Sequence, residues 1–126
     1  MSREIKFRFY NQLNSEKWSF YEKPLEDVES NDTLKSNAVC QFTGLLDKHG
    51  VEIYEGDIVK ITELYLDDDW FEILEVRYAS NGYHLYEKDS VGWRATLSRY
   101  EEKFRVEVIG NIYENSELLT PPKETP

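Results

Sequence analysis

The segment Gln41–Lys60, with the sequence QFTGLLDKHGVEIYEGDIVK, constrains the fold more than the residues around it. It contains two turn signals, Asp47–Gly50 and Glu55–Asp57, with a short apolar stretch between them. Gly50 can adopt the positive φ that many tight turns require. Apolar residues precede the first turn at Ala38–Phe42 and follow the second turn. The pattern therefore predicts strand, turn, short strand, turn and strand, and the glycines need no ligand to explain them.

The N-terminal residues predict a β-hairpin. In Arg3–Phe9, apolar residues at positions 5, 7 and 9 alternate with Lys6 and Arg8. Alternation with a period of two is typical of a half-buried strand. Trp18–Tyr21 is expected to return as its partner. The cations of the first strand are expected on a solvated face, paired with acids elsewhere.

The second half of the chain carries further strand signals. Phe71–Tyr78 predicts a strand. Asn81-Gly82 lies between Val76–Ser80 and Tyr83–Tyr86, and this two-residue turn favours a hairpin because both residues tolerate positive φ. Trp93–Leu97 predicts a short strand, and Phe104–Ile112 predicts a last long one.

These signals predict a mostly β fold, a small barrel-like or sandwich domain of short antiparallel strands. We expect an N-terminal hairpin and at most one or two short helical turns. Residues 1–119 are predicted to form a single β-rich domain. An alternative division places a small N-terminal subdomain at residues 1–37, with a mobile acidic connection at 22–37. Residues 120–126 are predicted to be a frayed tail.

Charge and cysteine content exclude several classes of protein. Asp and Glu number 25 against 15 Lys and Arg, so the net charge is -10, which disfavours direct binding to nucleic acid. Cys40 is the single cysteine, which excludes an internal disulfide and the usual thiolate zinc site. No apolar run reaches the ~20 residues that span a bilayer. We expect a protein of the host cell cytoplasm, without a membrane partner.

Candidate chemical groups favour no reaction. Asp67, Asp68 and Asp69 lack the spacing of a calcium loop and predict a solvated loop tip. His49 and His84 have no accompanying nucleophile motif. Cys40 lies in an apolar strand, where a thiol is usually inert. The sequence therefore predicts no catalytic, cofactor-binding or metal-binding residue.

A candidate interaction surface comprises aromatic and acidic residues at two places. Tyr54, Glu55 and Asp57 lie at the centre of the constrained segment, and the acidic loop tip at 67–69 is followed by Trp70. Tyrosine is favoured at interfaces because it has an apolar body and a polar tip. Tyr54 can equally cap the core beside Ile53, and the sequence leaves both interpretations open.

Three stretches carry a resemblance to a known family. They are the segment QFTGLLDKHGVEIYEGDIV, the sequence VIGNIYEN near the end and the opening REIKFR. Together they extend from Arg3 to Asn115, with a divergent middle. On these stretches the chain resembles the YopX family of phage and prophage proteins. The resemblance implies a mostly β fold and a phage or prophage origin, and it carries over no catalytic residue.

We therefore expect a non-enzymatic phage protein that binds a protein partner or assembles with itself as a homo-oligomer. The many aromatic residues without a catalytic constellation motivate this expectation. One alternative is an acidic nucleic-acid mimic that inhibits a DNA-binding host protein, motivated by the negative charge. A second alternative is a small barrel that binds nucleic acid in a groove, which the charge disfavours.

Overall fold

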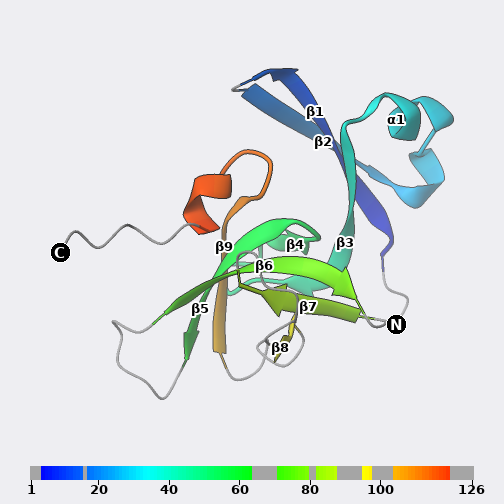
Figure 1. Cartoon of the computed structure of the whole chain (residues 1–126). Coiled ribbons are helices and arrows are strands. Elements are labelled where there is room, and N and C mark those ends of the chain that lie inside the picture. The colour runs from blue at the N-terminus through cyan, green and yellow to red at the C-terminus, as the bar shows by residue number, and fades with distance from the viewer. Residues whose placement is uncertain are drawn as a thin grey trace.

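The computed structural model describes residues 4–15, 17–63, 71–79, 82–87, 95–97 and 104–119. Its strands form two antiparallel sheets, one in the order β2-β1-β3-β4 and one in the order β8-β7-β6-β5-β9 (Figure 1). The strands are β1 (Lys6–Asn14), β2 (Lys17–Pro24), β3 (Ala38–Leu46), β4 (Glu52–Tyr54), β5 (Asp57–Glu63), β6 (Glu72–Ala79), β7 (Gly82–Tyr86), β8 (Ala95–Thr96) and β9 (Phe104–Asn111). The helical elements are η1 (Leu25–Asp27), α1 (Ser30–Lys35) and η2 (Ser116–Leu119).

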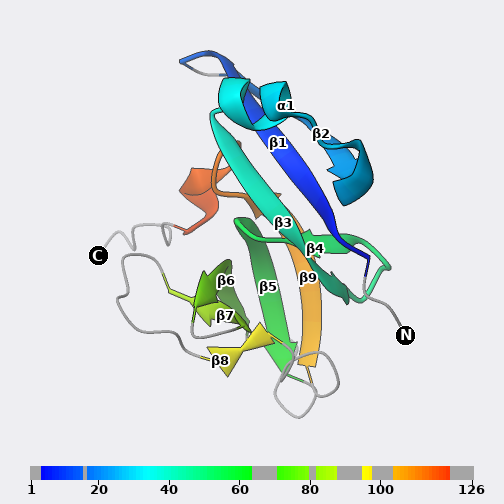
Figure 2. The same cartoon turned by 90° about the vertical axis from the view of Figure 1, so that its right-hand side faces the viewer.

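The first sheet is built around β1. It pairs with β2 along residues 6–12 and, on its other side, with β3 along residues 7–10. The connection from β2 to β3 contains η1 and α1. Both views show the tip of the β1–β2 hairpin extending away from the second sheet (Figures 1 and 2).

The second sheet holds the aliphatic core. Buried branched side chains from five strands and residue 97 pack together there: Ile53, Val59, Ile61, Leu74, Val76, Leu85, Leu97 and Val106. Burial of one such side chain stabilises a fold by roughly 1.5–3 kcal/mol. Ile53 comes from β4, so the last strand of the first sheet helps to close the core of the second.

The constrained segment has the predicted order. β3 ends in a turn with Gly50 at φ 82°, β4 follows, and a turn with Gly56 at φ 88° leads into β5. Gly56 donates its N–H to the carbonyl of Val76 at 2.8 Å and accepts the N–H of Ile112 at 2.9 Å. Both contacts are to the second sheet, since Val76 lies on β6 and Ile112 follows β9, so they hold the turn between β4 and β5 against that sheet.

The mostly β fold of short antiparallel strands with an N-terminal hairpin is confirmed. The hairpin predicted at Asn81-Gly82 is present as the β6–β7 pair, although residues 80–81 lie outside the described residues. Residues 22–37, expected as a connection, contain the end of β2, η1 and α1, and η2 is a helical element that the sequence did not indicate. The division into domains stays a prediction, and the tail at 120–126 is not described.

Candidate functional site

The two sheets meet at Arg8, in the middle of β1. Its guanidinium donates hydrogen bonds to Asp57 Oδ1 at 3.3 Å and to the Tyr10 hydroxyl at 3.2 Å. Glu22 Oε2 on β2 accepts two further bonds, at 2.8 Å from Nη2 and 3.1 Å from Nε. The planar guanidinium has several donors in a rigid fork, so these partners fix its orientation.

Two aromatic rings enclose the same guanidinium. Its Cζ lies 4.2 Å from the ring centroid of Phe20 and 4.0 Å from that of Tyr54. The Arg8 side chain retains only 12% of its exposure. Burial lowers the pKa of Arg8, but its hydrogen bonds and the neighbouring carboxylates outweigh burial and raise it. Arg8 therefore stays charged, and cation–π contact of this kind contributes roughly 0.5–2 kcal/mol.

Asp57 is the partner of Arg8 from the second sheet. Its side chain is 1% exposed, and Oδ2 accepts the backbone N–H of Tyr54 at 2.8 Å. Burial raises the pKa of Asp57 to about 7, against the lowering effect of that N–H and of Arg8. The carboxyl thus closes the turn at Gly56 and binds β1 at the same time.

Aromatic side chains continue the junction on the other side of Tyr10. The ring of Tyr113, after β9, lies 4.3 Å from that of Tyr10 and 5.4 Å from that of Trp18. Cys40 Sγ lies 3.4 Å from the Tyr113 hydroxyl. Burial raises the pKa of Cys40 to about 11, so the thiol is protonated at neutral pH and is a poor nucleophile, as its strand context predicted.

Asp47, in the first turn, has a structural role. Its carboxylate accepts backbone N–H bonds from His49 at 2.8 Å and from Val51 and Val108 at 2.9 Å. Burial raises the pKa of Asp47, but these donors outweigh burial and lower it. Among the described residues, no group of acids, histidines and cysteine is placed to hold a metal ion.

The second notable feature is the outer strand of the first sheet, β2. Three hydrogen bonds show which way the neighbouring backbone points. Leu25 donates to the Ile5 carbonyl at 2.9 Å, on the β2 side of β1. Gln12 donates to Asn37 Oδ1 at 2.8 Å, and Asn37 donates to the Tyr10 carbonyl at 2.9 Å, both on the β3 side. Odd-numbered residues of β1 therefore bond toward β2 and even-numbered residues toward β3.

In an antiparallel ladder, bonding residues alternate along each strand. Odd-numbered residues of β2 pair with odd-numbered residues of β1, as in Phe9↔Tyr21. The backbone groups of Trp18, Phe20 and Glu22 consequently point to the outer edge, where the described strands include no neighbour. Pro24 occupies the next outward position and has no N–H to offer.

The side chains of β2 divide between two faces. Trp18, Phe20 and Glu22 face the Arg8 junction, as their contacts show. On the opposite face, the Tyr21 hydroxyl donates to Asp32 Oδ1 at 2.7 Å, and Lys23 Nζ lies 3.0 Å from Asp32 Oδ2. The second face is thereby tied to α1.

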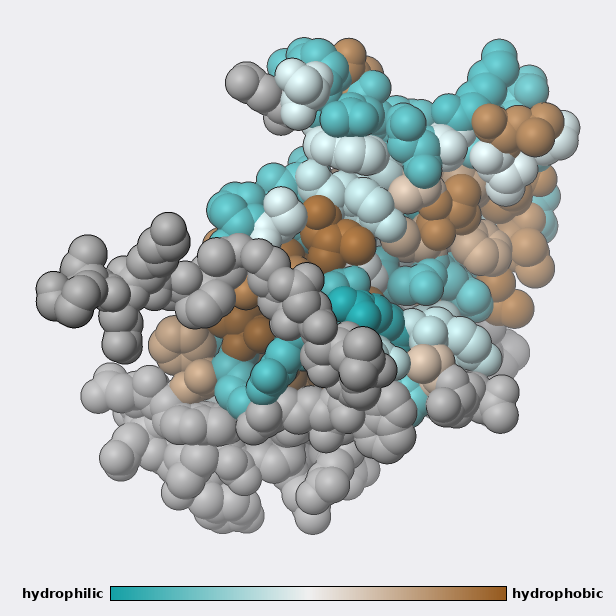
Figure 3. All heavy atoms as spheres, in the orientation of Figure 1, coloured by the Kyte–Doolittle hydropathy of each residue, from teal (hydrophilic) through white to brown (hydrophobic). Residues whose placement is uncertain are grey.

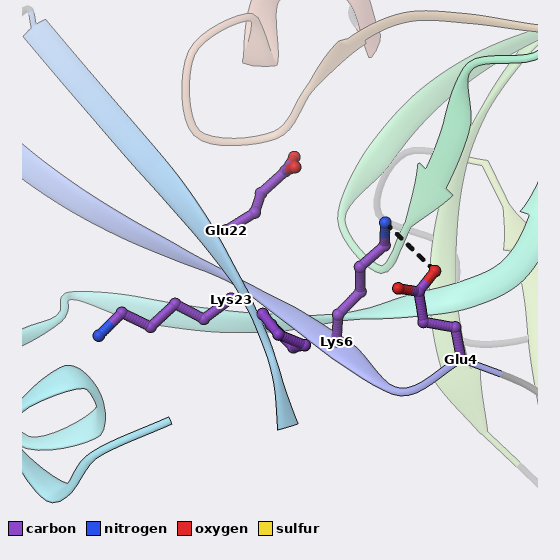
Figure 4. Close-up of a pocket in the computed structure, with 5 residues that line it drawn as sticks. Glu4, Lys6, Glu22 and Lys23 are labelled. Carbon is purple, nitrogen blue, oxygen red and sulfur yellow. Dashed lines mark ion pairs between the residues drawn. The ribbon is translucent and has the colours of Figure 1, made fainter. Parts of the chain in front are cut away.

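A shallow hollow lies where β1 begins and β2 ends. Glu4, Lys6, Glu22, Lys23 and Pro24 line a volume of about 220 Å³. Figure 4 shows Lys6 reaching toward Glu4 while Lys23 points the other way. Lys6 also contacts Glu52, and Lys23 contacts Asp32. Because both lysines are already paired with carboxylates, the hollow has no evident preference for a charged ligand.

A family model described as YopX protein matches residues 2–120. The chain belongs to the YopX family. The three stretches that carry the YopX resemblance meet at the junction, supplying Arg8 from the opening, Tyr54 and Asp57 from the constrained segment and Tyr113 from the end.

Among the solved structures similar to this YopX-family chain is the crystal structure of protein EF1440 from Enterococcus faecalis, at 26% sequence identity and a TM-score of 0.50. The match covers 87% of this chain and 74% of that one. No curated protein matches the chain.

The residues of the predicted interaction surface differ in their burial. Tyr54 and Asp57 are 0% and 1% exposed, so the expectation that they form part of an outer surface is corrected. They are buried because Arg8 lies over them. Glu55 is half-buried. Asp67, Asp68, Asp69 and Trp70 lie outside the described residues, and their contribution stays a prediction.

Sequence reasoning missed the role of Arg8. The cation was expected on a solvated face, and it does pair with acids, but its side chain is largely buried. The alternation in β1 correctly separated Arg8 from Phe7 and Phe9. The alternation carried no information about Phe20 or Tyr54, whose rings cover the face of β1 on which Arg8 lies.

Proposed function

We propose that this YopX-family chain is a non-enzymatic module that binds protein along the open edge of β2. The observation that carries the proposal is the outward direction of the backbone groups of Trp18, Phe20 and Glu22. Such an edge is a template for a further strand, from a partner protein or from a second copy. Family membership supports a role in a phage or prophage.

Exposed aromatic side chains flank the edge on both faces. Phe20 is 40% exposed and Tyr21 is 38% exposed. In recognition by strand addition, main-chain hydrogen bonds provide affinity and alternate side chains provide specificity. An added strand would cover part of both rings, because neighbouring strands lie about 4.8 Å apart.

Apolar surface continues next to β2. Figure 3 shows hydrophobic side chains gathered on the side of the first sheet that carries η1 and α1. Among the exposed residues there are Leu25 at 50% and Leu34 at 78%, and Val39 on β3 is 39% exposed. Leu25 follows β2 directly, so a partner strand seated on β2 meets this exposed apolar side chain at the end of the strand.

The nucleic-acid alternatives receive less support. A mimic needs unpaired carboxylates spaced along one face, and on the first sheet and its neighbour β4 the carboxylates of Glu22, Asp32 and Glu52 are each paired with a cation of their own chain. A nucleic-acid groove needs free cations, and those same ion pairs occupy Lys6, Arg8 and Lys23.

Two substitutions of Phe20 test the proposal. Phe20→Pro and Phe20→Ala both remove the ring, but only Phe20→Pro removes the outward N–H. Proline is tolerated where the N–H of an edge strand faces solvent, so circular dichroism and thermal unfolding should show both variants folded.

Each variant is then compared with the wild type by light scattering and by affinity capture from a bacterial lysate. Complexes formed by the wild type should persist, weakened, in Phe20→Ala and be absent in Phe20→Pro. Complexes that survive in Phe20→Pro, or a wild type that forms none, would overturn the proposal.

A further inference from the structure

We propose that the occupant of the β2 edge is β2 of a second copy, paired antiparallel about a two-fold axis at Phe20. This inference rests on the proposed function and deepens it by naming the partner and the register. It would join two four-stranded sheets into one continuous sheet.

The outward backbone groups determine the register. Trp18, Phe20 and Glu22 are symmetric about Phe20, so one arrangement uses all of them: Trp18 opposite the partner copy's residue 22, and Phe20 opposite its own equivalent. Each such pair exchanges two hydrogen bonds, about six in all. If the two-fold axis lay closer to the C-terminus of β2, the pairing would include Pro24, which has no N–H. If the axis lay closer to the N-terminus, Glu22 would have no partner among these three outward residues.

The charge along the edge is compatible with a second copy. The chain has a net charge of -10, so two copies repel each other at long range. The central residues 18–21, Trp-Ser-Phe-Tyr, carry no charge. On the C-terminal side the flanking charges are compensated within each chain, because Glu22 contacts Arg8 at 2.8 Å and Lys23 contacts Asp32 at 3.0 Å. On the N-terminal side, Lys17 would lie opposite residue 23 of the other copy, where the Asp32 carboxylate offsets part of the repulsion between the two cations. The remaining repulsion arises from this pair and from the net charge of the rest of the molecule, and salt screens it.

A two-fold pairing also protects the edge. An interface of this type uses the same patch on both copies and closes on itself, so no strand edge remains at β2 to add further chains. The stacked Phe20 rings would lie near the axis, and Ser19 of each copy would lie opposite residue 21 of the other. The self-complementary centre is the reason for choosing a second copy over an unrelated strand.

Light scattering at low and high salt is the first test. The wild type should be a dimer whose dissociation constant falls as salt rises, because screening weakens the long-range repulsion. Phe20→Pro should be monomeric at both salt concentrations, and Phe20→Ala should dissociate at least tenfold more readily than the wild type. A dimer that persists in Phe20→Pro would place the interface elsewhere and overturn the inference.

Cysteine cross-linking tests the register. Hydrogen-bonded pairs place their Cα atoms about 5.5 Å apart, within the range that a disulfide bridges. Phe20→Cys should form a covalent dimer under mild oxidation. Leu34→Cys, on α1 and 78% exposed, is the matched control and should stay monomeric on a denaturing gel. The wild type controls for Cys40, which is buried.

Two outcomes separate this inference from the proposed function. A monomeric wild type that captures a foreign protein, with capture lost in Phe20→Pro, would overturn the second copy as occupant and leave the interaction module standing. A monomeric wild type that captures nothing would overturn both.

Discussion

The two sheets are stabilised in different ways. The second sheet buries branched aliphatic side chains such as Ile61, Leu74 and Leu85, which are 0–1% exposed. The inner face of the first sheet instead buries aromatic rings and one guanidinium, Arg8, against the carboxyl of Asp57. Aliphatic burial is non-directional, whereas a guanidinium needs donors and acceptors at defined positions.

This difference indicates that the two regions contribute different properties to the fold. The aliphatic core contributes stability with few geometric demands, and the Arg8 junction determines how the first sheet is held against the second. Because β2 is a partner of Arg8 through Glu22 and Phe20, the junction also holds the proposed binding edge in position.

Arg8→Met should have the largest effect on the junction. Methionine retains apolar length but leaves Asp57 buried beside no cation. At pH 8, above the pKa of Asp57, loss of one partner of a buried ion pair costs about 3–5 kcal/mol. Urea denaturation measures the free energy of unfolding. Lys48→Met is the control, since Lys48 and Glu107 form an exposed pair at 3.6 Å whose loss should cost less than about 1 kcal/mol. Equal costs for the two variants would contradict a special role for Arg8.

Leu85→Ala tests the other region. Leu85 is fully buried in the aliphatic core, and removal of such a side chain costs about 3 kcal/mol, from lost burial and the cavity left behind. The same urea titration measures it, and the deficit should be the same at pH 4 and pH 7. A deficit that changes strongly with pH would show that the core and the junction are coupled.

Asp57→Asn should change how the stability of the junction depends on pH. The pKa of Asp57 is raised from 3.8 to about 7 in the folded state, so between these values the folded chain holds a proton that the unfolded chain has lost. Its stability contribution is therefore full at low pH and is lost as pH rises, at up to about 1.4 kcal/mol per pH unit. The wild type should lose stability relative to Asp57→Asn from pH 4 to pH 7. A gain instead would mean that Arg8 keeps Asp57 ionised and lowers its pKa.

The smallest expected effects concern two turn glycines. Gly56 lies at the junction with φ 88°, and Gly50 lies on an open turn with φ 82°. Alanine at either position adopts a left-handed conformation at a cost of about 1–2 kcal/mol. An added Cβ at Gly56 would meet the Tyr113 ring at 3.4 Å and Cys40 Sγ at 3.5 Å, ordinary contact distances, whereas Gly50 has open space. Thermal unfolding should give similar shifts, and a much larger shift for Gly56→Ala would show a junction with no room for a methyl group.

Local pattern was sufficient for most strands. The alternation in β1, the turns at Gly50 and Gly56 and the hairpin of β6 and β7 are all properties of residues close together in the chain. The buried state of Cys40 was also predictable, because Ala38, Val39 and Phe42 make this part of β3 largely apolar. The pattern also separated the two faces of β1, with Arg8 on the face opposite Phe9.

The junction was not predictable in this way. Arg8 and Asp57 are 49 residues apart, and the alternation of a strand does not say which element covers each face. Tyr54 was left open between core and interface, and it is buried because the guanidinium of another strand lies over its ring. The acidic stretch at 67–69 and Trp70 lie outside the described residues, so that half of the predicted surface stays a prediction.

The sequence by itself determined the strands, the two glycine turns and the mostly β class, because backbone conformation depends on neighbouring residues. Only the tertiary structure decided that Arg8 is enclosed rather than solvated. It alone also decided that β2 is the outer strand, with the backbone groups of Trp18, Phe20 and Glu22 directed outward. Both facts depend on which strands lie side by side, and strand order is set by contacts between residues far apart in the chain.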